Sequence, residues 1–166
     1  IRFDPKKGFF LNGKRVKLKG TNNHQDHAGV GAAIPDALQE FRIAALKKFG
    51  CNAYRASHNP PTPELLAACD RLGMLVINEN RLMGTTDYHY DHLKRLILRD
   101  RNHPSVIMWS VGNEEWRVEG TEQGTRITAA MQAWVKQLDA TRPVTIAISG
   151  GLGGGEFLPG GSAGGD

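Results

Sequence analysis

The stretch that decides the fold reads Ser105-Val106-Ile107-Met108-Trp109-Ser110-Val111, and Gly112-Asn113-Glu114-Glu115 follows it directly. A short run that is nearly all apolar is typical of a buried strand. The polar residues come at the point where this strand ends. The segment therefore predicts a buried strand whose carboxyl end carries a group of polar side chains.

Four further apolar runs flank this strand and alternate with helical patterns. The predicted strands are 16–20, 52–56, 74–77, 105–111 and 144–148, and the predicted helices are 36–49, 63–72, 91–100 and 125–138. In the first helix, one apolar face is expected to pack inward; it contains Leu38, Phe41, Ala45, Leu46 and Phe49. Asn12-Gly13, between apolar flanks, predicts a tight hairpin turn ahead of the first strand. Strands separated by single helices predict parallel pairing with right-handed crossovers.

Such a parallel sheet is either open and doubly wound or part of a barrel. Polar residues follow each of the first four strands, at 22–27, 55–59, 78–81 and 112–115. Polar groups that converge from successive strand ends favour a barrel mouth. No glycine-rich phosphate fingerprint follows the first strand, which argues against a dinucleotide fold. We therefore predict an α/β fold: a partial (β/α)8 TIM barrel of about five βα units, preceded by a β-hairpin.

The composition divides the chain into two parts. Residues 1–149 are predicted to form the partial barrel. Nine of the 17 residues from Gly150 to Asp166 are glycine, which predicts a flexible tail because glycine has no side chain to bury. The chain opens on Ile1-Arg2-Phe3, so we expect it to start within a longer protein, and its compartment stays undecided.

The bulk composition excludes some partners. The 166 residues are 40% hydrophobic and 23% charged, as in ordinary soluble globular proteins. The net charge is +4, but the basic residues stand singly or in pairs such as Lys6-Lys7. Nucleic-acid sites are usually clustered, so we expect no nucleic-acid partner. No apolar run approaches the roughly 20 residues of a membrane span, so we expect no membrane partner.

Glu114 is the sharpest candidate for chemistry. A carboxyl group at the end of a buried strand is expected to be partly desolvated, which favours its protonated form near neutral pH. A protonated carboxyl group is what a general acid needs to protonate a glycosidic oxygen. Asn113 beside it offers hydrogen bonds to sugar hydroxyls, and Trp109 and Trp116 offer apolar faces to a pyranose. The alternative is that Glu114 only caps a turn.

Five segments of the chain resemble glycoside hydrolase family 2, the β-galactosidase and β-glucuronidase group. Residues 100–114 closely resemble that family's acid/base signature. The other similar segments are 18–24, 52–60, 69–76 and 139–144. The motifs stand in the family's order, and together they cover roughly residues 8 to 149. Any one alone would be weak, but five in order are specific.

This resemblance implies a retaining β-glycosidase, most similar to the β-galactosidases, with an eight-stranded barrel preceded by β-sandwich domains. Glu114 would be the acid/base, and Asn113 would bind the sugar 2-hydroxyl. The substrate pocket would also include His24, Asp26, Arg55, His58 and Glu79. No cofactor is implied. From the residues alone, an ion pair of Arg55, a turn role of His58 and metal-dependent hydrolysis through His24 and His27 remain alternatives.

The chain departs from the family's pattern in two ways. A retaining mechanism needs a second carboxylate about 5–5.5 Å from the first, and the resemblance implies that this nucleophile lies beyond the end of this chain. Glu156, in the glycine-rich segment, is not accepted as that nucleophile. In place of the longer acidic and histidine-containing loop of metal-binding galactosidases, the chain has Asn80-Arg81-Leu82-Met83-Gly84; no metal site is therefore expected.

Five parallel strands cannot close a barrel, so the first and fifth strands are expected to present unpaired edges. The remainder of a longer chain, a second copy or the chain's own tail would cover these edges. The leading hypothesis is therefore a fragment of a glycosidase that binds a β-glycoside or oligosaccharide but has no activity alone. The alternative is a catalytically inert fragment for carbohydrate binding or assembly.

Overall fold

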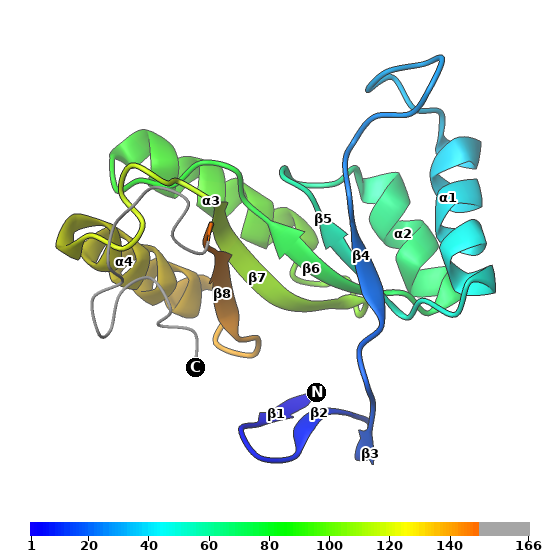
Figure 1. Ribbon diagram of the computed structural model, residues 1–166, viewed down its shortest axis with the longest axis horizontal. Coiled ribbons are helices and arrows are strands. Elements are labelled where there is room, and N and C mark those ends of the chain that lie inside the picture. Colours follow the sequence, from blue (N-terminus) through cyan, green and yellow to red (C-terminus); the bar gives the residue numbers. More distant parts are fainter. Residues whose placement is uncertain (150–166) are drawn as a thin grey trace.

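The structure is a computed structural model, and it describes residues 1–149. Figure 1 shows a small sheet beneath a larger sheet that helices cover. The small sheet contains β1 (Arg2–Asp4), β2 (Gly8–Leu11) and β3 (Lys14–Arg15). The larger sheet contains β4 (Gly20–Asn23), β5 (Ala53–Ala56), β6 (Leu75–Glu79), β7 (Val106–Asn113) and β8 (Val144–Ala147). The helices are α1 (Asp36–Lys48), α2 (Pro63–Leu72), α3 (Asp87–Asp100) and α4 (Glu122–Leu138).

The larger sheet has its strands in chain order, from β4 to β8, and each strand is parallel to its neighbours. One helix joins each strand to the next. The predicted alternation of strands and helices is therefore confirmed. Within residues 1–149, β4 and β8 are the outer strands and each pairs on one side only, as expected for an unclosed set.

The main core lies between the helices and one face of the parallel sheet. Its fully buried side chains come from all four helices and from the strands, for example Ile43, Leu66, Ile97 and Met131. The ends of α2 follow local rules. The Thr62 hydroxyl accepts a hydrogen bond from the Leu65 amide, and Gly73 ends the helix in the left-handed conformation.

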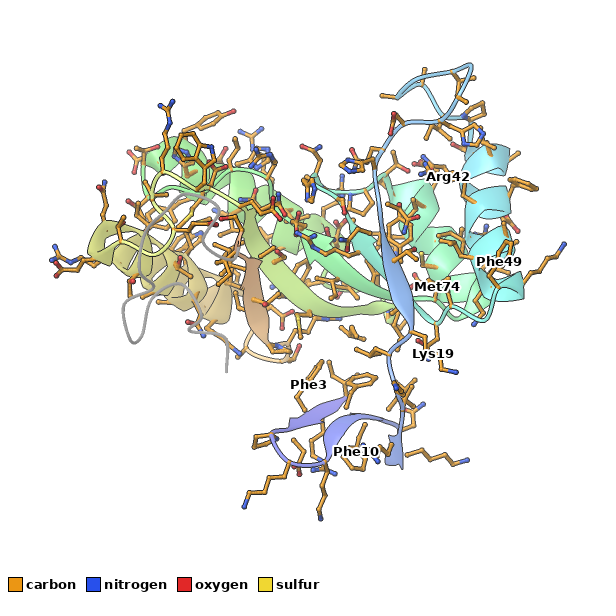
Figure 2. All side chains as sticks on the ribbon, in the orientation of Figure 1. Phe3, Phe10, Lys19, Arg42, Phe49 and Met74 are labelled. Atoms are coloured by element: carbon orange, nitrogen blue, oxygen red, sulfur yellow. The ribbon has the colours of Figure 1, made fainter. Side chains whose placement is uncertain are left out.

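The prediction of which α1 side chains face inward is partly wrong. Phe41 and Phe49 are 63% and 89% exposed, whereas Ile43 and Gln39 are buried; Phe49 stands at the end of the helix (Figure 2). α1 follows the outer strand β4 and packs against α2 on one side. Within residues 1–149 no element covers these two phenylalanine rings.

The first barrel strand begins later than the sequence predicts. The prediction was 16–20, but β4 is Gly20–Asn23. The apolar side chains of Val16 and Leu18 pack instead in a second cluster with Phe9 and Ile107. At Gly20 a β-carbon would lie 2.4 Å from the Ala53 carbonyl oxygen, so β4 and β5 approach each other too closely there for a side chain.

The predicted hairpin forms, and it gains a strand that the sequence did not suggest. Asn12 and Gly13 both have positive φ, as a tight turn requires. β1 then pairs antiparallel with β2. Figure 2 shows Phe3 on the side of this sheet that faces the barrel strands and Phe10 on the opposite side. Phe9 also packs against β6 and β7 residues, so the small sheet covers the amino ends of the parallel strands (Figure 1).

Asp139, directly after α4, joins β7 to the segment before β8. It accepts hydrogen bonds from the Thr141 hydroxyl, Trp109 Nε1 (2.9 Å), the Thr141 amide (2.8 Å) and Arg142 Nη1 (2.7 Å). Burial acts to raise the pKa of Asp139, but these hydrogen bonds outweigh it and lower the pKa from 3.8 to about 2. The folded state therefore favours the ionised carboxylate.

This pKa shift predicts acid-dependent stability. The contribution of Asp139 is present above pH 3.8 and disappears as the pH falls towards about 2. We expect it to amount to about 2 kcal/mol. In urea unfolding, the difference in stability between the unchanged chain and Asp139→Asn should be larger near about pH 5 than near about pH 2. The exposed Asp91→Asn is the control, and an equal difference at both pH values would contradict the prediction.

Candidate functional site

The buried carboxylate of Glu79 is the centre of a polar cluster at the carboxyl edge of the parallel sheet. Glu79 ends β6 and is 0% exposed. One of its oxygens accepts hydrogen bonds from Arg55 Nε at 2.7 Å and Ser110 Oγ at 2.8 Å. The other lies 2.7 Å from His58 Nδ1. A buried charge needs such partners, so the network holds all four side chains in place.

Arg55 extends this network to Asn113. Its Nη2 donates to Asn113 Oδ1 at 2.7 Å, and Asn113 is itself buried. The strands explain why these residues meet. β6 lies between β5 and β7, with Glu79 in register with Ser110. Parallel strands bring their carboxyl ends to the same edge, so Arg55, Glu79 and Asn113 converge from three strands.

The loop after β4 carries two predicted pocket residues, His24 and Asp26. It brings only His24 to this cluster. The His24 ring meets the His58 ring edge to face, with centroids 5.1 Å apart. Gln25 Nε2 anchors the loop by donating to the carbonyl oxygens of Asn59 (2.9 Å) and Pro60 (2.7 Å). Asp26 is exposed, and among residues 1–149 its carboxylate has no hydrogen-bond partner. The geometry therefore places His24, but not Asp26, against the cluster.

Glu114 directly follows Asn113, at the end of β7. Its amide donates to the Ala147 carbonyl oxygen at 2.9 Å, and its φ is +48°. The side chain is exposed in the described chain. The expected desolvation of this carboxyl group is therefore wrong for residues 1–149. The physical reason is that β8 is the last described strand, so no further strand encloses the loop.

Trp109 does not reach the cluster. It is 0% exposed, and its Nε1 donates to Asp139 Oδ2 at 2.9 Å on the side of the sheet that the helices cover. The prediction that Trp109 contacts a sugar is therefore wrong, because alternation along β7 turns Ser110, and not Trp109, towards Glu79. Trp116 is 58% exposed on the loop after β7, with the Arg117 guanidinium carbon 4.9 Å from the centre of its ring.

Sequence reasoning did not single out Ser110, and it placed Arg81 and Glu115 among the polar residues after strands without pairing them. Ser110 donates to Glu79, and Arg81 forms an ion pair with Glu115 at 2.6 Å. The position of Ser110, between two buried apolar residues of a strand, is a signal that could have found it. Arg81 and Glu115 lie on different loops, and no local pattern in the sequence pairs them.

The described residues show no metal centre. Within residues 1–149, no three side chains of histidine, cysteine, aspartate or glutamate lie close enough together to hold a metal ion.

None of the described helices is long and apolar enough to cross a membrane. The cluster offers charged and amide hydrogen-bonding groups around the fixed carboxylate of Glu79, and Glu114 directly follows Asn113, a member of the cluster. Such a set suits the recognition of a polyhydroxylated ligand. Glu156 and the predicted glycine-rich tail lie outside the described residues.

Comparisons with known proteins agree with the architecture. The chain matches the family model described as "Glycosyl hydrolases family 2, TIM barrel domain" over residues 4–87 and 84–151. A crystal structure of a glycosyl hydrolase family 2 member from Bacteroides cellulosilyticus superposes with a TM-score of 0.81 and 46% sequence identity, covering 89% of this chain and 21% of that one. The predicted partial barrel is thereby confirmed.

Two curated relatives are similar in sequence. A β-galactosidase of Bacteroides ovatus is 37% identical over 88% of this chain and 22% of its own length. A β-glucuronidase of Rattus norvegicus is 36% identical over 85% of this chain and 23% of its own length. The chain thus spans about a fifth of the length of these relatives.

Proposed function

Because the chain belongs to glycosyl hydrolase family 2 and forms part of its TIM barrel, we propose that it supplies the acid/base side of a retaining β-glycosidase site. Glu114 is the general acid/base. The nucleophilic glutamate comes from outside the described residues. The observation that carries this proposal is the Glu79 cluster, which fixes Asn113 at the carboxyl edge of the sheet, directly before Glu114.

In this mechanism Glu114 first donates a proton to the glycosidic oxygen as the bond to the leaving group breaks. The nucleophile forms a glycosyl-enzyme intermediate, and Glu114 then takes a proton from the water that hydrolyses it. Asn113 bonds the sugar 2-hydroxyl, a contact that strengthens in the transition state. Arg55 holds the Asn113 side chain in position for this contact.

The proposed pocket also takes in His24, His58 and Glu79, with Asp26 on the same loop as His24. Glu79 fixes Arg55 and His58 through its two oxygens, so its role is to orient other side chains. His58, whose ring can form hydrogen bonds, and the polar loop after β4 favour a β-galactoside as the substrate. The β-galactosidase and the β-glucuronidase are similar to this chain to the same degree, so this choice rests on His58 and the residues of the loop and not on the comparisons.

The outer strands define what must complete the site. β4 and β8 have unpaired edges within the described residues, and Phe41 and Phe49 lie exposed on α1. Exposed edges and apolar rings are surfaces that proteins normally cover. We infer that further barrel strands from the remainder of a longer polypeptide cover these surfaces and bring the nucleophile. A second copy would cover the edges but would carry the same residues, and so no nucleophile.

A chimaera tests this function. Residues 4–149 would replace the matching segment of the Bacteroides ovatus β-galactosidase, which supplies the other strands. We expect the folded chimaera to hydrolyse a chromogenic β-galactoside and the 166-residue chain alone to show no turnover. A chimaera that gives the circular dichroism of the host and binds galactose without turnover would contradict the proposal and favour an inert carbohydrate-binding fragment. Preference for a chromogenic β-glucuronide would overturn the choice of substrate.

A further inference from the structure

The direction in which the Glu114 side chain leaves the chain is set by its backbone. Within residues 1–149 no other side chain donates a hydrogen bond to its carboxylate, and the side chain is exposed. Its φ of +48° lies in the left-handed region, which non-glycine residues rarely adopt. Such a conformation persists only where neighbouring contacts maintain it. The contacts on either side of Glu114 therefore decide the direction in which its side chain leaves the turn.

Arg81 makes contacts on both sides of Glu114. It lies on the loop between β6 and α3, and its Nη1 is 2.6 Å from Glu115 Oε1. The same nitrogen donates to the Asn113 carbonyl oxygen at 3.3 Å. The residue before Glu114 is thus held through its backbone, and the residue after it through its side chain.

Three other contacts hold the same turn. The Glu114 amide donates to the Ala147 carbonyl oxygen in β8, the Trp116 amide donates to the Glu114 carbonyl oxygen within the turn, and Arg55 holds the Asn113 side chain from β5. Arg81 adds a link from the β6–α3 loop. These links join the turn to β8, to β5 and to the β6–α3 loop, so its conformation depends on tertiary contacts as well as on local sequence.

We propose that Arg81 is a positioning residue that holds Glu114 in the left-handed conformation from which it serves as acid/base. This inference rests on the proposed function. The ion pair itself is half-exposed, with Arg81 and Glu115 side chains 43% and 38% exposed. Pairs of that exposure contribute little to global stability. Arg81 therefore acts on local geometry, and its removal should leave the overall fold intact.

The first test measures the turn directly in the 166-residue chain. Arg81→Met keeps the aliphatic stem and removes the guanidinium. We expect hydrogen exchange of the Glu114 amide, followed by nuclear magnetic resonance, to become about tenfold faster because the turn opens locally. Arg71→Met removes an exposed ion pair with Glu40, between α2 and α1, and is the matched control. An unchanged Glu114 exchange rate, relative to this control, would overturn the proposal.

The second test asks whether the geometry matters for catalysis. In the chimaera, Arg81→Met should lower kcat by about 10- to 100-fold with little change in KM, because small displacements of a catalytic group slow the chemical step. Faster exchange without a fall in kcat would show a merely structural contact and would overturn the positioning role. If the unsubstituted chimaera is itself inactive, the proposed function fails, while the exchange experiment still decides whether Arg81 holds the turn.

Discussion

Replacing Glu114 with glutamine in the chimaera should lower kcat for an unactivated β-galactoside by about 10²- to 10⁴-fold, the range that general acid–base catalysis supplies. Glutamine keeps the size of the side chain but cannot transfer the proton. The backbone of the turn, with its hydrogen bond from the Glu114 amide to Ala147, should persist. The measured loss would therefore report the chemistry of one carboxyl group.

The leaving group and the pH profile separate this role from a general disturbance. A galactoside with a dinitrophenolate leaving group needs no proton, so its bond cleavage should be much less affected. The alkaline limb of the kcat profile, which reports the acid, should disappear. Glu40→Gln, in an exposed ion pair on α1, is the control. Glu114→Gln activity within about fivefold of the control would rule out the assigned role.

Much of the fold was predictable because local rules and the tertiary structure agree. The apolar strand β7, the Thr62 cap and the Asn12-Gly13 turn each appear where the sequence indicates. Boundaries failed where packing decided them. Val16 and Leu18 read as a strand, but they cover the amino ends of β6 and β7. Their apolar character was recognised, but their partners lie about 60 to 90 residues away in the chain.

The candidate site was predictable in its parts but not in its connections. Polar residues after strands identified Arg55, His58, Glu79 and Asn113, and the structure joins these four in one network. Trp109 failed because the sequence shows that a residue is in a strand more clearly than which face it occupies. A buried strand that is apolar on both faces gives no alternation to decide the matter.

Replacing Glu79 with alanine should destabilise the 166-residue chain by about 3–5 kcal/mol, the cost typical of breaking a buried ion pair. The loss leaves Arg55, whose side chain is 16% exposed, without its principal partner. It also leaves the Ser110 hydroxyl and the His58 ring without their shared acceptor. Urea unfolding at neutral pH measures the effect. Glu40→Ala, which removes an exposed carboxylate, should change stability by less than about 1 kcal/mol.

A second variant separates the fold from the site. If Arg55→Met and Glu79→Met are combined, no buried charge stays unpaired, and most of the lost stability should return because apolar side chains often replace buried ion pairs without cost. The same double variant in the chimaera should stay inactive, because Asn113 loses the Arg55 contact that orients it. Recovered stability without activity would mean that this ion pair serves the sugar site more than the fold. Glu79→Ala unfolding like Glu40→Ala would instead mean that water replaces the lost partners, and the network would no longer explain why these strand ends are held together.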